Sequence, residues 1–435
     1  MIHKNQLQAL LPAVTANLSL RAISILAKFA LLAYLGRYTT LADLGTYGLL
    51  VTSLGLGVQL LGMEFYIFNT REILGCDEPE RVILFRDQLV FHSLTYIVFL
   101  PGLSILFFTN TLPWELIVWF YILVVLEHLS LELSRLLTVL GRPVFANFIE
   151  FIRSASWVAI AITIGLQVPE YRSIETIMIF WVLGGLLSLF IGWKPLQQWD
   201  WSTTWKIRPR LDWMRKGVLV AIPFFISSVA LMTIYFSDRF ILKQFLGLEQ
   251  VGIYTFHQSV AGLVYTAITT GVIGILYPKL VRAFLVGNMP QYTQELKNFA
   301  IIITSGSIVV GVFLILVFPF AADFMKDPRF LETRSTFLVL LLGSIIQNLS
   351  FIPHYDLYAR SFDRELMWAA IFGAVVNIGL NFLLIPKFGI LGAAWATAIA
   401  FLSLLVAKTV FARIRFKGTA RAVDYGGQNQ QKYPR

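Results

Sequence analysis

Twelve apolar runs, each 20 to 30 residues long, leave this chain few ways to fold. A helix of about 20 residues crosses the ~30 Å hydrocarbon layer of a bilayer, and only a helix satisfies its own backbone hydrogen bonds within one segment. The runs are too long and too uniformly apolar for the alternating strands of a β-barrel. We therefore predict an all-α integral membrane protein with about twelve transmembrane helices. The runs cover residues 10–35, 41–63, 87–108, 114–137, 144–166, 174–193, 218–246, 251–280, 299–320, 337–357, 366–385 and 390–410.

The composition agrees with a membrane protein and argues against other classes. Of the 435 residues, 57% are hydrophobic and 14% charged, whereas soluble proteins are roughly 25% charged. The net charge of +10 comes from basic residues in short loops and in the tail, which argues against nucleic acid as a partner. Cys76 is the only cysteine, so neither a disulfide nor a cysteine-based metal site is expected.

The distribution of Lys and Arg predicts the orientation of the chain. Successive connections between the runs would lie on opposite sides of the membrane. The connections on the same side as the two termini carry, together with the termini, 24 Lys and Arg, and the connections on the other side carry 7. By the positive-inside rule, both termini are expected in the cytoplasm. A long basic connection divides the chain, with a six-helix lobe at 1–193, a basic cytoplasmic linker at 194–216, a second six-helix lobe at 217–411 and a polar cytoplasmic tail at 412–435. The linker is rich in Trp and is expected to lie along the inner membrane surface.

The two lobes show a weak internal repeat. The segment Leu41–Tyr47 (LADLGTY) is similar to Leu248–Tyr254 (LEQVGIY), 207 positions later. Because each lobe has an even number of helices, the repeat is parallel, and a substrate site is expected between the two copies. Chance similarity between apolar segments is the alternative interpretation.

The first apolar run carries a polar stripe with charges at mid-membrane depth. Asn17, Arg21, Ser24 and Lys28 share one helix face, and Arg21 lies about 16 Å beyond Leu10. A cation facing lipid there costs roughly 2.5–3.5 kcal/mol. We therefore expect the stripe to line a hydrated cavity. Lys28 lies near the outer end of the run. Its ammonium group could instead reach the membrane–water interface and form an interhelical ion pair, and this alternative stays open.

Other charged residues fall inside the apolar runs. Arg153 and Arg239 are further candidates for binding an anionic head group, although Arg153 can instead pair with Glu150 three residues earlier. The acids Asp238, Glu127 and Glu132 are candidates for binding a coupling ion or for pairing with a cation. Glu132 shares a helix face with His128 and Arg135, and for this group a structural hydrogen-bond network is favoured over a proton relay. Cationic groups outnumber acids, which favours an anionic cargo with phosphate groups.

Prolines interrupt two of the predicted helices. Pro223 and Pro353 remove a backbone donor and crowd the preceding turn, so they are candidate hinges, with a static bend as the alternative. The chain carries no phosphate-binding loop, no paired Cys/His spacing and no nucleophile elbow. We therefore expect a transporter and no cofactor, with H+ or Na+ left open as a coupling ion.

Two stretches resemble the multidrug/oligosaccharidyl-lipid/polysaccharide exporter superfamily. One runs from Asn377 to Pro386 (NIGLNFLLIP) and continues from Gly389 to Thr397 (GILGAAWAT). The other runs from Asp238 to Gly247 (DRFILKQFLG) and through Val251–Tyr254, and it is similar to the polysaccharide-exporter branch. Within this superfamily the chain most resembles Wzx-type flippases for O-antigen units. It lacks a carboxylate in the first run, unlike cation-coupled multidrug exporters, and it lacks the two extra helices of peptidoglycan-precursor flippases.

The resemblance implies a flippase for a polyprenyl-pyrophosphate-linked oligosaccharide, working by alternating access in the biosynthesis of O-antigen-like lipopolysaccharide or another surface polysaccharide. It implies a bacterial inner (cytoplasmic) membrane, with the lipid-linked oligosaccharide and membrane lipids as partners and polysaccharide polymerase machinery as a further one. Two alternatives stay open. One is a cation-coupled multidrug exporter of the same fold, and the other is a membrane glycosyltransferase or polymerase.

Overall fold

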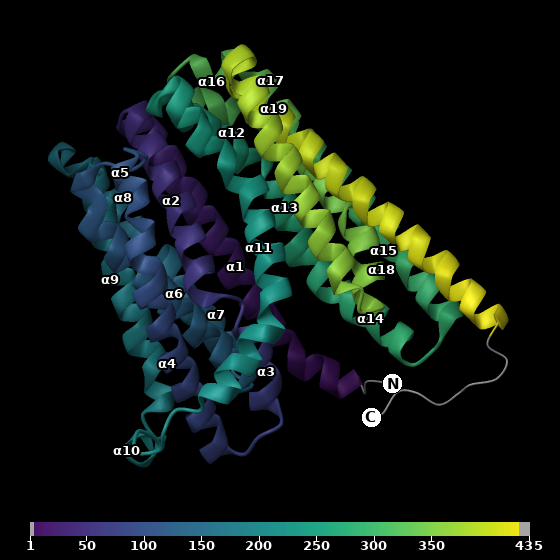
Figure 1. The fold of residues 1–435 in the computed structure, drawn as a ribbon. Coiled ribbons are helices and arrows are strands. Elements are labelled where there is room, and N and C mark those ends of the chain that lie inside the picture. Colours follow the sequence, from purple (N-terminus) through teal and green to yellow (C-terminus); the bar gives the residue numbers. More distant parts are fainter. Residues whose placement is uncertain (1–3, 426–435) are drawn as a thin grey trace. The chain divides into compact units, whose positions relative to one another are not determined.

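The computed structural model describes the backbone of residues 4–425 and the side chains of residues 15–414 apart from Leu18. Within this part of the chain the protein is all-helical and contains no strand (Figure 1). Part of the polar tail predicted at 412–435 lies outside the described backbone, from residue 426 onward. The first half forms α1 (Lys4–Tyr38), α2 (Leu41–Gly62), α3 (Tyr66–Leu74), α4 (Glu78–Leu103), α5 (Ile105–Phe108), α6 (Ile117–Val139), α7 (Pro143–Phe151), α8 (Trp157–Gln167), α9 (Ile174–Trp193) and α10 (Trp201–Thr204).

The second half continues with longer helices. These are α11 (Leu211–Leu246), α12 (Leu248–Ala261), α13 (Leu263–Ile268), α14 (Gly274–Leu285), α15 (Met289–Phe324), α16 (Arg329–Glu332), α17 (Arg334–Leu349), α18 (Phe351–Ala359) and α19 (Asp363–Tyr425). Short 3-10 turns occur at η1 (Trp114–Leu116), η3 (Pro169–Tyr171) and η4 (Lys194–Leu196). Two π-helical turns, η2 (Ile152–Ser156) and η5 (Thr269–Ile273), interrupt what would otherwise be continuous helices.

Eleven helical segments of the described chain are long and apolar enough to cross a membrane. The last, Asp363–Ile414, has 52 residues and would be about 78 Å long if straight. It folds back at Gly389, whose φ of 60° is accessible to glycine at little cost. Gly373 of the first arm accordingly packs against Ala400 and Leu404 of the second arm of this helical hairpin. The two arms account for the last two of the twelve predicted runs, and the predicted fold class is confirmed.

The chain forms two compact units. The first contains residues 1–229, 239–256 and 320–332, and the second contains 230–238, 257–319 and 333–435. In the first unit α2, α7 and α9 pack around α6, α4 packs against α2, and α1 lies along α7, η2 and α8. In the second unit α17 and α18 pack on the α19 hairpin, whose arms contribute Ala370 and Phe401 to a shared core.

Local capping explains where several helices begin. Thr40 and Asp43 form a reciprocal capping box at the start of α2, and Asp77 and Ser173 cap α4 and α9 through their side-chain oxygens. The end of α2 is less relaxed, because Met63 and Glu64 both have positive φ, at 47° and 55°. Such values are unfavourable for residues with a side chain, so the turn between α2 and α3 is held by its surroundings.

The basic linker docks on α4 through buried charges. Arg86, which is 1% exposed, donates to the carbonyl oxygens of Thr204 at 2.7 Å and Ile207 at 2.6 Å. Asp87 accepts from Arg86 and, at 2.8 Å, from Arg210 of the linker. Hydrogen bonds to Asp87 and Glu80 outweigh partial burial and raise the pKa of Arg210. The linker is therefore anchored to the first unit. Its placement on a membrane surface stays a prediction.

Small residues allow a close contact between the two copies of the sequence repeat. A Cβ added to Gly45 of α2 would lie 2.0 Å from the carbonyl oxygen of Leu248, and one added to Gly252 of α12 would lie 2.3 Å from that of Leu41. These positions lie within the first compact unit. The contact is reciprocal, because Leu41 and Gly45 correspond to Leu248 and Gly252 in the repeat. The motif that identified the repeat thus forms a contact with its own copy.

Candidate substrate-binding site

The polar stripe predicted on α1 runs along the surface of that helix in the first unit. Arg21 and Lys28 are both exposed, and neither forms an ion pair or hydrogen bond among the described side chains. Asn17 accepts a hydrogen bond of 3.0 Å from the side-chain amide of Asn147 on α7. Ser24 donates to the carbonyl oxygen of Leu20, one turn earlier. The stripe therefore faces α7 at Asn17 and presents two unpaired cations.

Arg153 lies next to this stripe, in the π-helical turn η2. Its guanidinium forms ion pairs with Glu127 of α6 and with Glu150 of α7. The pairing with Glu150 is the alternative that the sequence left open. Glu127 was a candidate for binding a coupling ion or for pairing with a cation, and here it pairs with Arg153. A π-turn is often found at functional sites, and here it carries the buried side chain of Arg153. Substrate contact by Arg153 stays a prediction.

Two tryptophans position the carboxylate of Glu127. Trp181 of α9 donates from Nε1 to Oε1 of Glu127 at 2.7 Å, and its ring stacks on Trp157 with centroids 5.8 Å apart. Trp157 in turn donates from Nε1 to the carbonyl oxygen of Arg153 at 2.9 Å. The carboxylate is thus held on one side by an indole and on the other by a guanidinium. The sequence alone offered no sign of this arrangement.

The charges of this region leave an excess of cations. Glu150 interacts electrostatically with Arg21 and Lys28 as well as with Arg153, and Lys28 interacts with Arg153 in turn. Three cations therefore share two carboxylates, those of Glu127 and Glu150. An anion carrying one or two charges that approached Arg21 and Lys28 would meet a net attractive potential. We call these five residues, Arg21, Lys28, Glu127, Glu150 and Arg153, the α1–η2 cluster.

The remaining predicted binding and pairing residues lie elsewhere. Arg239 of α11 is 8% exposed and donates to the hydroxyls of Thr52 at 3.1 Å and Thr255 at 3.3 Å in the first unit. Asp238 is fully buried and accepts a hydrogen bond of 3.4 Å from Thr397 in the second unit. Glu132 accepts from Arg135 at 2.5 Å and from Gln88 at 2.5 Å. Ligand or ion binding by these three residues stays a prediction.

The two candidate hinges differ in their local structure. Pro353 is the third residue of α18, and its ring crowds the carbonyl of Leu349 four positions earlier, where α17 ends. Pro223 lies within α11, which continues from Leu211 to Leu246 without a break. The helix break expected at a proline is therefore present at Pro353. Hinge motion at either position stays a prediction.

The second unit contains a buried cation that its sequence pattern did not indicate. Lys408 of α19 was assigned to the cytoplasmic end of the chain, but it is 4% exposed and lies near His354 of α18. It has no ion pair or hydrogen bond among the described residues. A cavity of about 620 Å³ lies in the same unit, between α15, α18 and α19, and it is lined mainly by apolar side chains with Asp356, Thr409 and Arg413. None of the predicted cationic binding residues lines this cavity.

The motif that carries the family resemblance has a structural use in the second unit. Asn377 and Asn381 of α19 are both fully buried and joined by a hydrogen bond of 3.0 Å. Ser237 of α11 donates to Asn377 at 2.7 Å. The two asparagines therefore hold α11 against the hairpin through hydrogen bonds inside an apolar segment, where such bonds contribute roughly 1 kcal/mol.

Comparison with known proteins identifies the fold as that of a class of membrane transporters. No family profile and no curated protein sequence matches the chain. Among solved structures, an inward-facing multidrug resistance MATE family transporter of the MOP superfamily aligns with a TM-score of 0.76 at 14% identity, covering 94% of this chain and 99% of that one. The lipid II flippase MurJ, in an inward closed conformation, aligns with a TM-score of 0.69 at 15% identity, covering 93% and 87%. An outward-facing MATE transporter aligns with a TM-score of 0.62 at 15% identity, covering 94% and 96%. The chain thus shares the fold of these MATE transporters and of MurJ.

Removal of Arg153 is expected to destabilise the first unit. Arg153→Met leaves Glu127 and Glu150 without their buried partner, and breaking such a pair costs roughly 3–5 kcal/mol. Thermal unfolding of the purified protein in detergent should therefore occur at a lower temperature. The double variant Arg153→Met/Glu127→Gln should recover part of the loss, because it leaves one stranded carboxylate instead of two. A single variant as stable as the wild type would contradict the structural role of these pairs.

Proposed function

We propose that this protein is a flippase that moves a polyprenyl-pyrophosphate-linked oligosaccharide across a bacterial cytoplasmic membrane by alternating access. The cargo would serve the biosynthesis of an O-antigen-like surface polysaccharide. The proposal includes both termini in the cytoplasm and cooperation with polysaccharide polymerase machinery. The shared fold supports it, since the structural neighbours include a lipid II flippase as well as multidrug transporters.

The observation that carries the proposal is the pair of exposed cations on α1, which form no ion pair with any side chain that the structure describes. Arg21 and Lys28 lie within a candidate membrane span, Thr15–Tyr38. Exposure to lipid would be costly for both, so their side of α1 is expected to face water or a polar cargo. Glu150, an acid that interacts electrostatically with both, is already paired with Arg153. A pyrophosphate supplies the missing negative charge, and an arginine can bind it through two parallel hydrogen bonds.

A multidrug exporter is the second candidate, and one observation favours it. Glu127 and Glu150 are carboxylates within candidate membrane spans, at 15% and 32% side-chain exposure, and carboxylates are the groups that bind a cationic drug or a coupling proton. Both are engaged by Arg153, however, so a cation would have to displace a guanidinium. We therefore favour the anionic cargo.

Transport by the purified protein in liposomes tests the proposal. Vesicles containing the full chain and a fluorescent polyprenyl-pyrophosphate-linked saccharide should expose the label to an impermeant quencher faster than protein-free vesicles. Parallel vesicles loaded with ethidium test for cation export. Ethidium transport without movement of the lipid-linked saccharide would favour the multidrug exporter and overturn the flippase proposal. In cells, depletion of the protein should cause lipid-linked saccharide to accumulate on the cytoplasmic side.

A further inference from the structure

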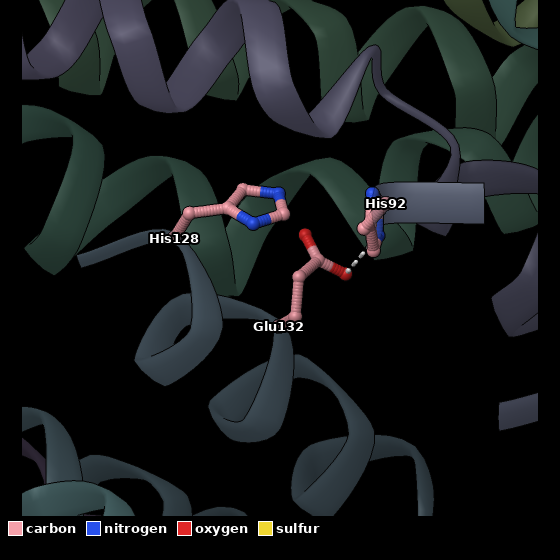
Figure 2. A group of neighbouring side chains, drawn as sticks. All are labelled: His92, His128 and Glu132. Atoms are coloured by element: carbon pink, nitrogen blue, oxygen red, sulfur yellow. Dashed lines mark ion pairs between the residues drawn. The ribbon is translucent and has the colours of Figure 1, made fainter. Parts of the chain in front are cut away.

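Three buried side chains in the first unit form a cluster that the transport proposal does not use. His92 comes from α4, and His128 and Glu132 come from one face of α6, four residues apart (Figure 2). Their exposed fractions are 1%, 0% and 3%. One nitrogen or oxygen atom of each lies within 4.8 Å of the corresponding atoms of the other two. Donor atoms this close together inside a helical bundle require a cation or hydrogen-bond donors between them.

Hydrogen bonding shows that His92 presents a lone pair to the cluster. The side-chain amide nitrogen of Gln88 lies 3.2 Å from Nε2 of His92 and donates to Oε2 of Glu132 at 2.5 Å. An amide nitrogen can only donate, so Nε2 of His92 must accept. Asn69 donates to the amide oxygen of Gln88, which fixes the orientation of the amide group. The NH2 group of Gln88 thus occupies the position of a cation between an imidazole and a carboxylate.

His128 offers a second nitrogen that has no hydrogen-bond partner among the described residues. Its Nδ1 is 2.7 Å from the hydroxyl of Tyr96, and its Nε2 is buried and unpartnered. When Nδ1–H donates to Tyr96, Nε2 carries a lone pair. This is the arrangement of metal-binding histidines, whose other ring nitrogen usually donates to a neighbouring acceptor. Gly62 leaves room here, because a Cβ at that position would lie 3.3 Å from Nε2 of His128 and 3.9 Å from Oε1 of Glu132.

We propose that His92, His128 and Glu132 form a binding site for a divalent transition metal ion of the zinc class. Two imidazole nitrogens and one carboxylate oxygen suit Zn²⁺, Co²⁺ or Ni²⁺, with water as a fourth ligand. Na⁺, Mg²⁺ and Ca²⁺ prefer oxygen ligands and do not fit this donor set. The metal replaces the amide of Gln88, which moves aside. It links α4 to α6 beside the positive-φ turn at Met63 and Glu64.

One cation already interacts with the cluster and limits its affinity for metal. Arg135 donates to Oε1 of Glu132 at 2.5 Å, while its guanidinium lies over the ring of Tyr66. The carboxylate is therefore shared between the arginine and the metal, and the positive charge of Arg135 opposes metal binding. Arg135→Gln should consequently increase the affinity, provided that Glu132 keeps its position.

Cobalt binding to the purified full-length protein, without a histidine tag, tests the proposal. We expect one Co²⁺ per chain, with visible absorption bands of a four-coordinate nitrogen–oxygen site that disappear on addition of Zn²⁺. His128→Gln and Glu132→Gln should each weaken Co²⁺ binding at least about tenfold. Gln88→Ala should strengthen it, and a gain of this kind cannot result from unfolding. His257→Gln, at a buried histidine paired with Thr333 in the second unit, should bind Co²⁺ like the wild type.

Several results would overturn the metal site. One is the absence of Co²⁺ binding by folded wild-type protein that elutes as a single species in size-exclusion chromatography. Another is unchanged binding in both His128→Gln and Glu132→Gln, or an equal loss in His257→Gln. Weaker binding by Gln88→Ala would also contradict the argument, because it would show that the amide supports the metal and does not compete with it. None of these measurements depends on transport.

Discussion

Arg21→Glu is expected to reduce transport of an anionic lipid-linked substrate by about 10- to 100-fold or more, while leaving insertion and folding intact. Hydrogen bonds to a charged group contribute roughly 1.5–3 kcal/mol, and 1.4 kcal/mol corresponds to a factor of ten. Charge reversal also adds a third carboxylate to the α1–η2 cluster and makes it repel the cargo. Because Arg21 is exposed and unpaired in the described structure, its loss leaves no buried partner stranded.

Three variants separate this effect from a general effect of charge. Arg21→Lys keeps the charge but not the bidentate geometry, so its transport should lie between wild type and Arg21→Glu. Arg142→Glu reverses an exposed arginine outside the candidate membrane spans and should transport normally. The readout is quencher accessibility of the labelled lipid-linked saccharide in liposomes. Equal rates for Arg21→Glu and wild type, or an equal loss in Arg142→Glu, would remove Arg21 from the binding site.

Gly45→Ala is expected to destabilise the protein by about 3 kcal/mol or more, at the upper end of the usual cost of overpacking. The added Cβ would lie 2.0 Å from the carbonyl oxygen of Leu248 and 3.1 Å from the backbone nitrogen of Gly252. Both are backbone atoms and cannot move aside as a flexible side chain can. The contact between α2 and the start of α12 would therefore have to loosen.

The matched control is Gly379→Ala in α19. A Cβ at that helical position meets nothing within 4 Å, so alanine should be neutral or slightly stabilising through its better helix propensity. Thermal unfolding in detergent, together with the yield of monodisperse protein, measures both variants. A Gly45→Ala protein as stable as Gly379→Ala would mean that α2 and α12 do not approach as closely as described.

Most of the fold follows from local sequence patterns, because each membrane-spanning helix satisfies its own backbone. The twelve apolar runs, the reversal near Gly389 and the break at Pro353 were all readable in this way. The exposure of Arg21 and Lys28 on one face of α1 also agrees with their spacing. The spacing of polar and apolar residues along one helix decides which of them share a face, and this does not depend on which helices pack beside it.

The long-range partners could not be predicted. Nothing near Arg153 in the sequence indicates a π-turn, and Glu127 and Trp181 reach the same place from two other helices. Arg86 and Lys408 were counted among the basic residues of the cytoplasmic connections and the C-terminal end, but both are buried. Arg86 is buried because the linker covers it, which only the packed structure can show. Arg239 was a candidate for binding an anionic head group, but reversing its charge would place a carboxylate among buried hydroxyls and would test folding instead of binding.

The mutual contact of Gly45 and Gly252 has the symmetry of an isologous interface. In such an interface, when residue i of one copy contacts residue j of the other, residue j of the first copy also contacts residue i of the second, as in a two-fold homodimer. Here Gly45 approaches Leu248 while Gly252 approaches Leu41, and each pair is the image of the other under the repeat. A half-length chain bearing this motif would be self-complementary at the same point, so this contact has the form of a two-fold dimer interface built within one chain.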